Sequence, residues 1–132
     1  MGGEILKAVL LDTHAWAWSL IQKSRLSEAA LAAMSQADTI LLSPVSFLEI
    51  AQKVRVGKWP DMAPIVERLP SLWRDQGGLV ADLQPEICVR AGIMIWSHCD
   101  PFDRLIAATA LHRNASLLSA DVVFDGFVTR VW

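Results

Sequence analysis

Apolar residues in this chain gather in short blocks separated by turn signals and by stretches of mixed character. Three continuous apolar runs lie at residues 8–11, 39–42 and 116–119, and each leads into a polar residue and then a turn or a helical pattern. Residues 78–82 and 127–131 are two similar stretches. Continuous rather than alternating apolar runs are typical of strands covered on both faces. The pattern therefore predicts five short, buried strands.

Helical spacing of apolar residues fills the intervals between these runs. Thr13, Ser27 and Ser43 are expected to cap the first three helices, and Pro70 is expected to interrupt the fourth. The expected helices are 14–21, 28–36, 44–56, 62–76, 85–96 and 101–113. Strands that alternate with helices predict a three-layer α/β/α sandwich around a mostly parallel sheet with right-handed crossovers.

Length and composition narrow the class of protein. With 132 residues, 53% of them hydrophobic and 20% charged, the chain is expected to fold as one globular domain over residues 1–132. It has no apolar run near the roughly 18 residues of a membrane span and no signal-peptide layout at its start. Cys88 and Cys99 are too few for a zinc motif or a redox pair, so we expect a reduced cytoplasmic setting. A net charge of −2 neither requires nor excludes a nucleic-acid partner.

The start of the helix at 101–113 carries two aspartates. Asp100 precedes Pro101 and fits the N-cap position, and Asp103 fits the third helical position, from which its side chain can bond back to the cap. Asp103 also lies on the apolar face of this helix, together with Ile106 and Ala107. A carboxylate drawn toward the interior needs a cation, hydrogen-bond donors or a chemical role.

Two other carboxylates are expected to lie near Asp103. Asp12 and Asp121 follow strand ends, and ligands of open parallel sheets bind there, where the strand order reverses. If the first strand is central, Asp12, Asp103 and Asp121 can converge. Two carboxylates about 4 Å apart repel by roughly 4 kcal/mol at an effective dielectric of 20, so such a cluster needs a cation or protonation. Oxygen-only ligands favour Mg²⁺ or Mn²⁺ over zinc, and phosphodiester hydrolysis is the natural chemistry of such a site.

Four segments carry a resemblance to a known family. They are Leu-Leu-Asp-Thr-His at 10–14, Ser-Pro-Val-Ser-Phe-Leu-Glu-Ile at 43–50, His-Cys-Asp-Pro-Phe-Asp-Arg-Leu-Ile-Ala-Ala at 98–108 and Leu-Ser-Ala-Asp-Val-Val-Phe at 118–124. In this order and spacing they resemble the PIN-domain proteins, and closely the VapC toxins of bacterial toxin–antitoxin pairs. The similarity runs from about residue 7 to the end of the sequence.

The resemblance implies a ribonuclease that depends on Mg²⁺ or Mn²⁺, with an acidic quartet at Asp12, Glu49, Asp103 and Asp121. It further implies a five-stranded parallel sheet in the order 3-2-1-4-5, a homodimer, and inhibition by a co-expressed antitoxin. One family pattern has Thr-x-Asp where this chain has Ser119-Ala120-Asp121, which is a conservative departure.

Each quartet residue also has a purely structural interpretation. Asp12 can cap the following helix, although Thr13 is available for that role. Glu49 lies off the apolar stripe of its helix and can pair with Lys53 four residues later. Asp121 can simply start a turn.

Three supporting residues are open to two interpretations as well. Thr13 can orient Asp12, touch a phosphate or cap the helix. Asp100 can cap its helix and also tune the acidic site from outside. Arg104 can contact a phosphate or anchor neighbouring carboxylates.

Aromatic and basic residues suggest contact surfaces. Trp16 and Trp18 lie on one helix and cannot both face the sheet, so one of them is a candidate for a dimer or antitoxin contact. The basic stretch 53–59 ends in Trp59 and is either a solvated helix end or a track for an RNA backbone.

Several function classes remain compatible with the sequence. The favoured one is a metal-dependent endoribonuclease that acts as a toxin on an RNA substrate. A catalytically silent PIN-fold binding module is the main alternative, and a DNA nuclease with the same site is another. An aspartyl-phosphate phosphotransferase is disfavoured, because His14 stands where that class needs a second acidic residue.

Overall fold

The computed structural model describes residues 7–132 and contains one parallel sheet. The expectation of no signal peptide concerns residues that include 1–6, which lie outside the described part. The five strands are arranged in the order β3-β2-β1-β4-β5, as predicted. Their bounds are β1 (Ala8–Leu11), β2 (Thr39–Leu42), β3 (Leu79–Val80), β4 (Ser116–Leu118) and β5 (Arg130–Val131).

All neighbouring strands pair in parallel, and β1 is the central strand. Leu11 pairs with Leu42 on one side and with Leu118 on the other, so these three strands end at the same level. Strands β2 and β3 are added on one side of β1, and β4 and β5 on the other. The strand order therefore reverses between β1 and β4, and this junction is the switch point of the sheet. The edge strands β3 and β5 are only two residues long, shorter than the predicted stretches 78–82 and 127–131.

Six α-helices connect the strands of the described chain, with three 3₁₀ segments. The α-helices are α1 (Thr13–Ile21), α2 (Glu28–Gln36), α3 (Pro44–Arg55), α4 (Leu69–Asp75), α5 (Pro85–Ile93) and α6 (Pro101–Arg113). The 3₁₀ segments are η1 (Lys23–Arg25), η2 (Pro60–Arg68) and η3 (Val122–Phe124). No helix within residues 7–132 combines the length and the apolar character needed to cross a membrane.

Two predicted helices differ from the observed ones. The predicted helix 62–76 is a 3₁₀ segment followed by α4, because Pro64 lies inside η2 and removes a backbone donor. Pro70 does not interrupt α4 but lies at its start, where the missing N–H is not needed. The predicted helix 85–96 ends at Ile93, and Met94 is already extended.

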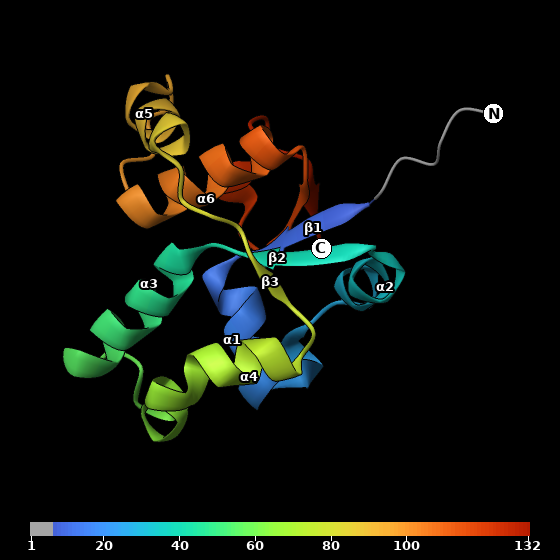
Figure 1. Ribbon diagram of the computed structural model, residues 1–132, viewed down its shortest axis with the longest axis vertical. Helices are drawn as coiled ribbons and strands as arrows, with labels where there is room; N and C mark the ends of the chain where they lie inside the picture. The colour runs from blue at the N-terminus through green and yellow to red at the C-terminus, as the bar shows by residue number, and fades with distance from the viewer. Residues whose placement is uncertain (1–6) are drawn as a thin grey trace.

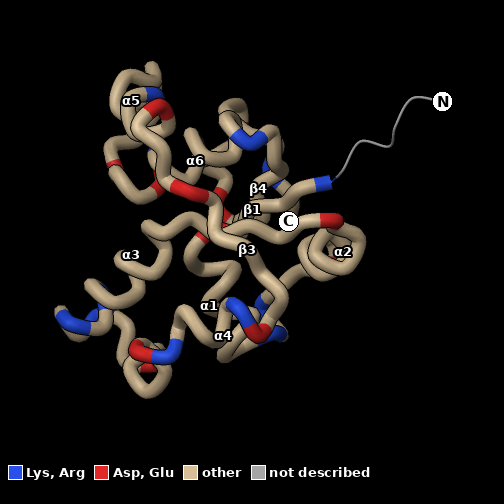
Figure 2. Tube along the Cα trace, viewed as in Figure 1, with Lys and Arg blue, Asp and Glu red and all other residues tan. Residues whose placement is uncertain are grey.

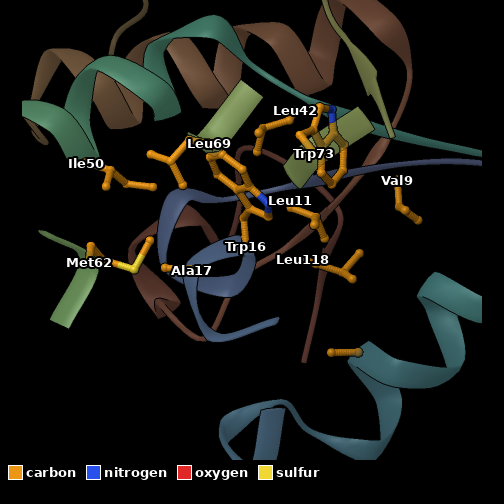
Figure 3. Close-up of a cluster of buried hydrophobic side chains, with 11 residues drawn as sticks. Val9, Leu11, Trp16, Ala17, Leu42, Ile50, Met62, Leu69, Trp73 and Leu118 are labelled. Atoms are coloured by element: carbon orange, nitrogen blue, oxygen red, sulfur yellow. The ribbon is translucent and has the colours of Figure 1, made fainter. Parts of the chain in front are cut away.

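The layers follow from the alternation of side chains along β1 (Figure 1). Val9 and Leu11 point into one core, which α1, α2 and α4 cover, whereas Leu10 points into a second core under α6. Trp16 and Trp73 fill the centre of the first core with their rings 5.8 Å apart (Figure 3). Helix α5 packs on α6, on the side away from the sheet. The observed architecture is therefore the predicted three-layer α/β/α sandwich.

Candidate active site

Asp12 lies at the end of β1 and at the beginning of α1. Its backbone N–H extends the β1–β4 ladder by donating to the Leu118 carbonyl at 3.0 Å. Its carboxylate accepts a hydrogen bond from the Ala15 N–H at 2.7 Å, so Asp12 and not Thr13 caps α1. Only 8% of Asp12 is exposed. Burial raises the pKa of Asp12 from an ordinary 3.8 to about 6, hydrogen bonds from Ser119 and Ala15 oppose the rise, and the negative charges of Asp103 and Glu49 add to it.

Glu49 lies in the middle of α3 and is 6% exposed. Its Oε2 accepts a hydrogen bond from the Lys53 ammonium at 3.1 Å, which is the helical pair that the spacing allowed. Its Oε1 is buried and has no hydrogen-bond partner within the described residues. A buried carboxylate oxygen left in this state is unfavourable, so Glu49 is a strong candidate for a ligand contact.

Asp103 lies in the first turn of α6 and contacts a histidine. Its Oδ2 is 2.7 Å from His98 Nε2, so it does not bond back to the cap as expected. Burial raises the pKa of Asp103, and the hydrogen bond with His98 opposes that rise. Asp100 is the N-cap of α6, as predicted, and its Oδ1 accepts from the N–H groups of Phe102 and Asp103.

Asp121 follows β4 and is exposed. Its Oδ1 accepts a hydrogen bond from the Val123 N–H at 3.0 Å, so Asp121 starts the 3₁₀ turn η3. Its own N–H donates to the Ser119 hydroxyl at 3.0 Å. Ser119 thus holds the backbone of Asp121, and its side chain lies near enough to Asp12 to lower the pKa of that carboxyl.

One pocket of about 500 Å³ receives all four carboxylates. It is lined by Asp12, Thr13, His14, Trp18, Arg25, Glu49, Lys53, Asp100, Asp103, Ala120, Asp121 and Phe124. Figure 2 shows acidic positions from separate segments near the place where α3, α6 and the end of β1 approach one another. The pocket thus lies at the carboxyl end of the central strand, where the sequence predicted convergence.

Two supporting residues have other contacts than those expected. The Thr13 hydroxyl is hydrogen-bonded to the Ser46 hydroxyl at 2.9 Å, in a buried contact that ties α1 to α3. Within residues 7–132, Arg104 forms no ion pair and does not line the pocket; its guanidinium donates to backbone carbonyl groups in the last turn of α5 and in the segment that joins α5 to α6. Its partners at 2.6–2.9 Å are the carbonyl oxygens of Ala91, Met94, Trp96 and His98. These hydrogen bonds fix the segment between α5 and α6 against the first turn of α6.

The carboxylates line a common pocket without being gathered into a ready-made metal cage. Within residues 7–132 no three His, Cys, Asp or Glu side chains are close enough to hold an ion as they stand. Instead each carboxylate has its own partner: Ala15 for Asp12, Lys53 for Glu49, His98 for Asp103 and Val123 for Asp121. Separate partners reduce the mutual repulsion of like charges. The oxygen-only donor set and the unpartnered Glu49 Oε1 nevertheless fit a hard divalent cation.

Sequence reasoning missed some of the residues that line the pocket. Arg25 reaches it from η1, where its guanidinium lies 4.2 Å above the Trp18 ring. No motif marks Arg25, and only the seven-residue spacing from Trp18 offers a signal. His98 is not among the predicted site residues, although its place within the 98–108 segment, five residues before Asp103, could have suggested the contact.

The fold and the pocket together define a class of protein: a three-layer α/β/α domain with an all-oxygen acidic site at the switch point of its parallel sheet. A model of the PIN domain matches residues 9–127, and the chain belongs to that family. Among curated relatives, Ribonuclease VapC22 from Mycobacterium tuberculosis is 29% identical over 117 residues, which cover 88% of each chain.

Solved structures confirm the fold. The chain is similar to one in the crystal structure of VapBC2 from Rickettsia felis bound to a promoter DNA fragment, with a TM-score of 0.63, 15% identity and coverage of 95% of this chain and 99% of that one. It is also similar to a chain of VapBC-1 from nontypeable Haemophilus influenzae, with a TM-score of 0.59, 20% identity and coverage of 87% of both chains. A toxin–antitoxin complex from Klebsiella pneumoniae gives a TM-score of 0.59 at 16% identity, covering 94% of this chain and 96% of that one.

Proposed function

We propose that this chain is a divalent-metal-dependent endoribonuclease and the toxin of a toxin–antitoxin pair. The observation that carries the proposal is the single pocket into which four segments bring Asp12, Glu49, Asp103 and Asp121. The buried, unpartnered Oε1 of Glu49 supports it further, because a cation would supply the missing partner. Membership of the PIN family and the relative named as a ribonuclease favour RNA as the substrate class.

The four carboxylates are the residues that would hold the ion. Mg²⁺ or Mn²⁺, when bound, supplies water activation and neutralises charge at a phosphodiester. Asp12 and Glu49 are the buried members, so their carboxylates would form the deeper side of the ion site. Asp103 is oriented by His98, and Asp121 by the turn that it caps.

Other residues position these carboxylates. The buried Thr13–Ser46 hydrogen bond fixes α1 against α3, and thereby Asp12 relative to Glu49. The Ser119 hydroxyl accepts from the Asp121 N–H and holds the start of the turn that carries this carboxylate. Arg104 holds the segment that carries His98, and Asp100 begins the helix that carries Asp103.

Partners and setting belong to the same proposal. Solved structures similar to this chain come from complexes named as VapBC or as toxin and antitoxin, which supports an antitoxin partner for this chain. The homodimer implied by the family resemblance belongs to the proposal as well. The two free cysteines in the described part are consistent with the cytoplasm as the setting. We propose one PIN domain spanning residues 1–132.

Thermal stability measured against Mn²⁺ and Mg²⁺ concentration tests the site. The antitoxin-free wild type is compared with Asp103→Asn and Glu49→Gln, and Glu86→Gln, an exposed acid outside the pocket, is the matched control. A ligand that binds only the folded state stabilises it by about 2.7 kcal/mol at a hundredfold excess over its dissociation constant. We expect wild type and Glu86→Gln to gain stability with metal, and the two site variants to lose most of that gain.

Cleavage of labelled single-stranded RNA and DNA tests the activity. We expect metal-dependent RNA cleavage that is lost in Asp103→Asn and Glu49→Gln and retained in Glu86→Gln. Cleavage of DNA but not RNA would assign the site to a DNA nuclease. Absence of both metal stabilisation and cleavage would leave the PIN-fold binding module as the better description.

A further inference from the structure

A second cavity opens beside the acidic pocket and differs from it in character. It has a volume of about 380 Å³, within the usual range of small-ligand sites. It is lined by His14, Trp18, Arg25, Lys53, Lys58 and Trp59. The first four of these also line the acidic pocket, so the two cavities are continuous. None of the six lining residues is an acid.

The rings that line this cavity belong to two segments, α1 and the connection between α3 and η2. The His14 ring is stacked on Trp59, with centroids 4.9 Å apart and an interplanar angle of 27°. Trp18 is tilted against His14 at 5.9 Å. Trp18 and Trp59 are each half-buried, and Trp59 packs against the first hydrophobic core. The aromatic surface is therefore anchored in the fold while part of it faces solvent.

Cations lie over and beside these rings. The Arg25 guanidinium is 4.2 Å from the Trp18 centroid, and Lys53 Nζ is 5.4 Å from the Trp59 centroid. Lys58 is exposed at the rim. These positive charges stand next to four carboxylates that would otherwise repel any phosphate approaching the acidic pocket.

We propose that this cavity is a nucleotide subsite, in which an unpaired RNA base stacks against Trp18 and Trp59 while its flanking phosphates contact Arg25 and Lys58. The inference rests on the proposed function, because it places the subsite next to the scissile phosphate. Successive stacked bases and a basic track are the usual means of holding a single strand without reading its sequence. Arg25, which lies over the Trp18 ring, turns to phosphate when a base takes its place, whereas Lys53 stays paired with Glu49.

The composition of the cavity favours a nucleic-acid strand over a protein segment. Arg25 and Lys58, with no acid in the lining, suit a polyanion, whereas the charge of Lys53 is balanced by Glu49. Continuity with the acidic pocket lets one strand occupy both cavities. Stacking needs a base that is not already paired, so single-stranded RNA is expected to bind better than duplex RNA.

Binding is measured by fluorescence anisotropy with a labelled 12-nucleotide single-stranded RNA of mixed sequence. All variants are made in an Asp103→Asn background, which prevents cleavage during the measurement. Removing a stacking ring weakens binding by about tenfold or more, so we expect this loss for Trp59→Ala and substantial recovery for Trp59→Phe. Thermal melts of each variant show whether it is folded.

Lys58→Ala supplies a test that does not disturb packing. Loss of one phosphate contact to a single strand lowers the slope of log K against log salt by about 0.7. Arg113→Ala removes an exposed cation at the far end of α6 and is expected to leave both affinity and slope unchanged.

The outcomes separate this inference from the proposed function. If wild type cleaves RNA but folded Trp59→Ala and Lys58→Ala bind the 12-mer like their parent, the subsite is refuted while the nuclease assignment survives. Unchanged RNA binding together with loss of antitoxin binding would assign the cavity to a protein partner and also refute the subsite. Failure of wild type to cleave RNA, with no binding by the Asp103→Asn parent, removes both proposals.

Discussion

Replacing Asp12 with asparagine is expected to stabilise the protein at neutral and alkaline pH while removing a proposed metal ligand. Asp12 is almost fully buried, and burial raises its pKa from 3.8 to about 6. Between these two values the folded state binds more protons than the unfolded state. The free energy of unfolding therefore falls as the pH rises through this interval.

The size of the effect follows from the shift. One pKa unit corresponds to 1.36 kcal/mol, so ionising Asp12 in the folded protein costs about 3 kcal/mol at pH values well above 6. Asparagine carries no charge and is as good an N-cap as aspartate, so the hydrogen bond from the Ala15 N–H can be kept. We expect Asp12→Asn to gain roughly 2–3 kcal/mol at pH 8 and almost nothing at pH 4.

Urea unfolding monitored by tryptophan fluorescence measures this difference. Wild type and variant are compared at pH 4, 6 and 8 in the presence of EDTA, so that no metal contributes. Asp75→Asn, at an exposed position at the end of α4, is the matched control and should show no pH-dependent gain. An Asp12→Asn variant no more stable than wild type at pH 8 would refute the idea that this carboxylate is held at a cost in free energy.

Three further changes test the supporting structure. Thr13→Val leaves the buried Ser46 hydroxyl without its partner and should cost about 1–2 kcal/mol in urea unfolding, with partial recovery when Ser46→Ala is added. Gly78→Ala places a Cβ into the Trp73 ring and should cost about 1–3 kcal/mol, whereas Gly78→Ser with no loss of stability would contradict the contact. Arg104→Ala removes all its hydrogen bonds to the carbonyls between α5 and α6; hydrogen exchange of that segment should accelerate, and unchanged protection would show that the arginine is dispensable.

The fold was the most predictable part of this protein. The continuous apolar runs of β1, β2 and β4 marked buried parallel strands, and the family resemblance supplied the observed sheet order. The edge strands were overestimated, because an apolar run shows which residues can be buried and not how many of them find a pairing partner. Helix starts were predicted well where a serine or aspartate precedes a proline, as at Ser43 and Asp100.

The candidate site was predictable in its carboxylates but less so in their contacts. The positions of Asp12 and Asp121 at strand ends predicted that both would line one pocket. Glu49 could be predicted as a site residue only from the family resemblance, because its helix pattern indicated only a pair with Lys53. Local pattern could not choose between Asp12 and Thr13 as the cap, since both residue types are good N-caps. Contacts such as that between Arg25 and Trp18 depend on how loops pack, and single-sequence periodicity does not encode that packing.

The four carboxylates of the pocket lie far apart in the sequence, and this separation determines when the pocket can form during synthesis. Its carboxylates come from β1, α3, α6 and the turn after β4, so the pocket exists only when β4 has paired beside β1 and both flanking helices have docked. No fragment that ends before Asp121 contains all four carboxylates. During synthesis, the segments that form α1 to α4 are therefore made before the last carboxylate of the pocket. A partner that recognises those earlier surfaces has an interval in which to bind the chain before it becomes active.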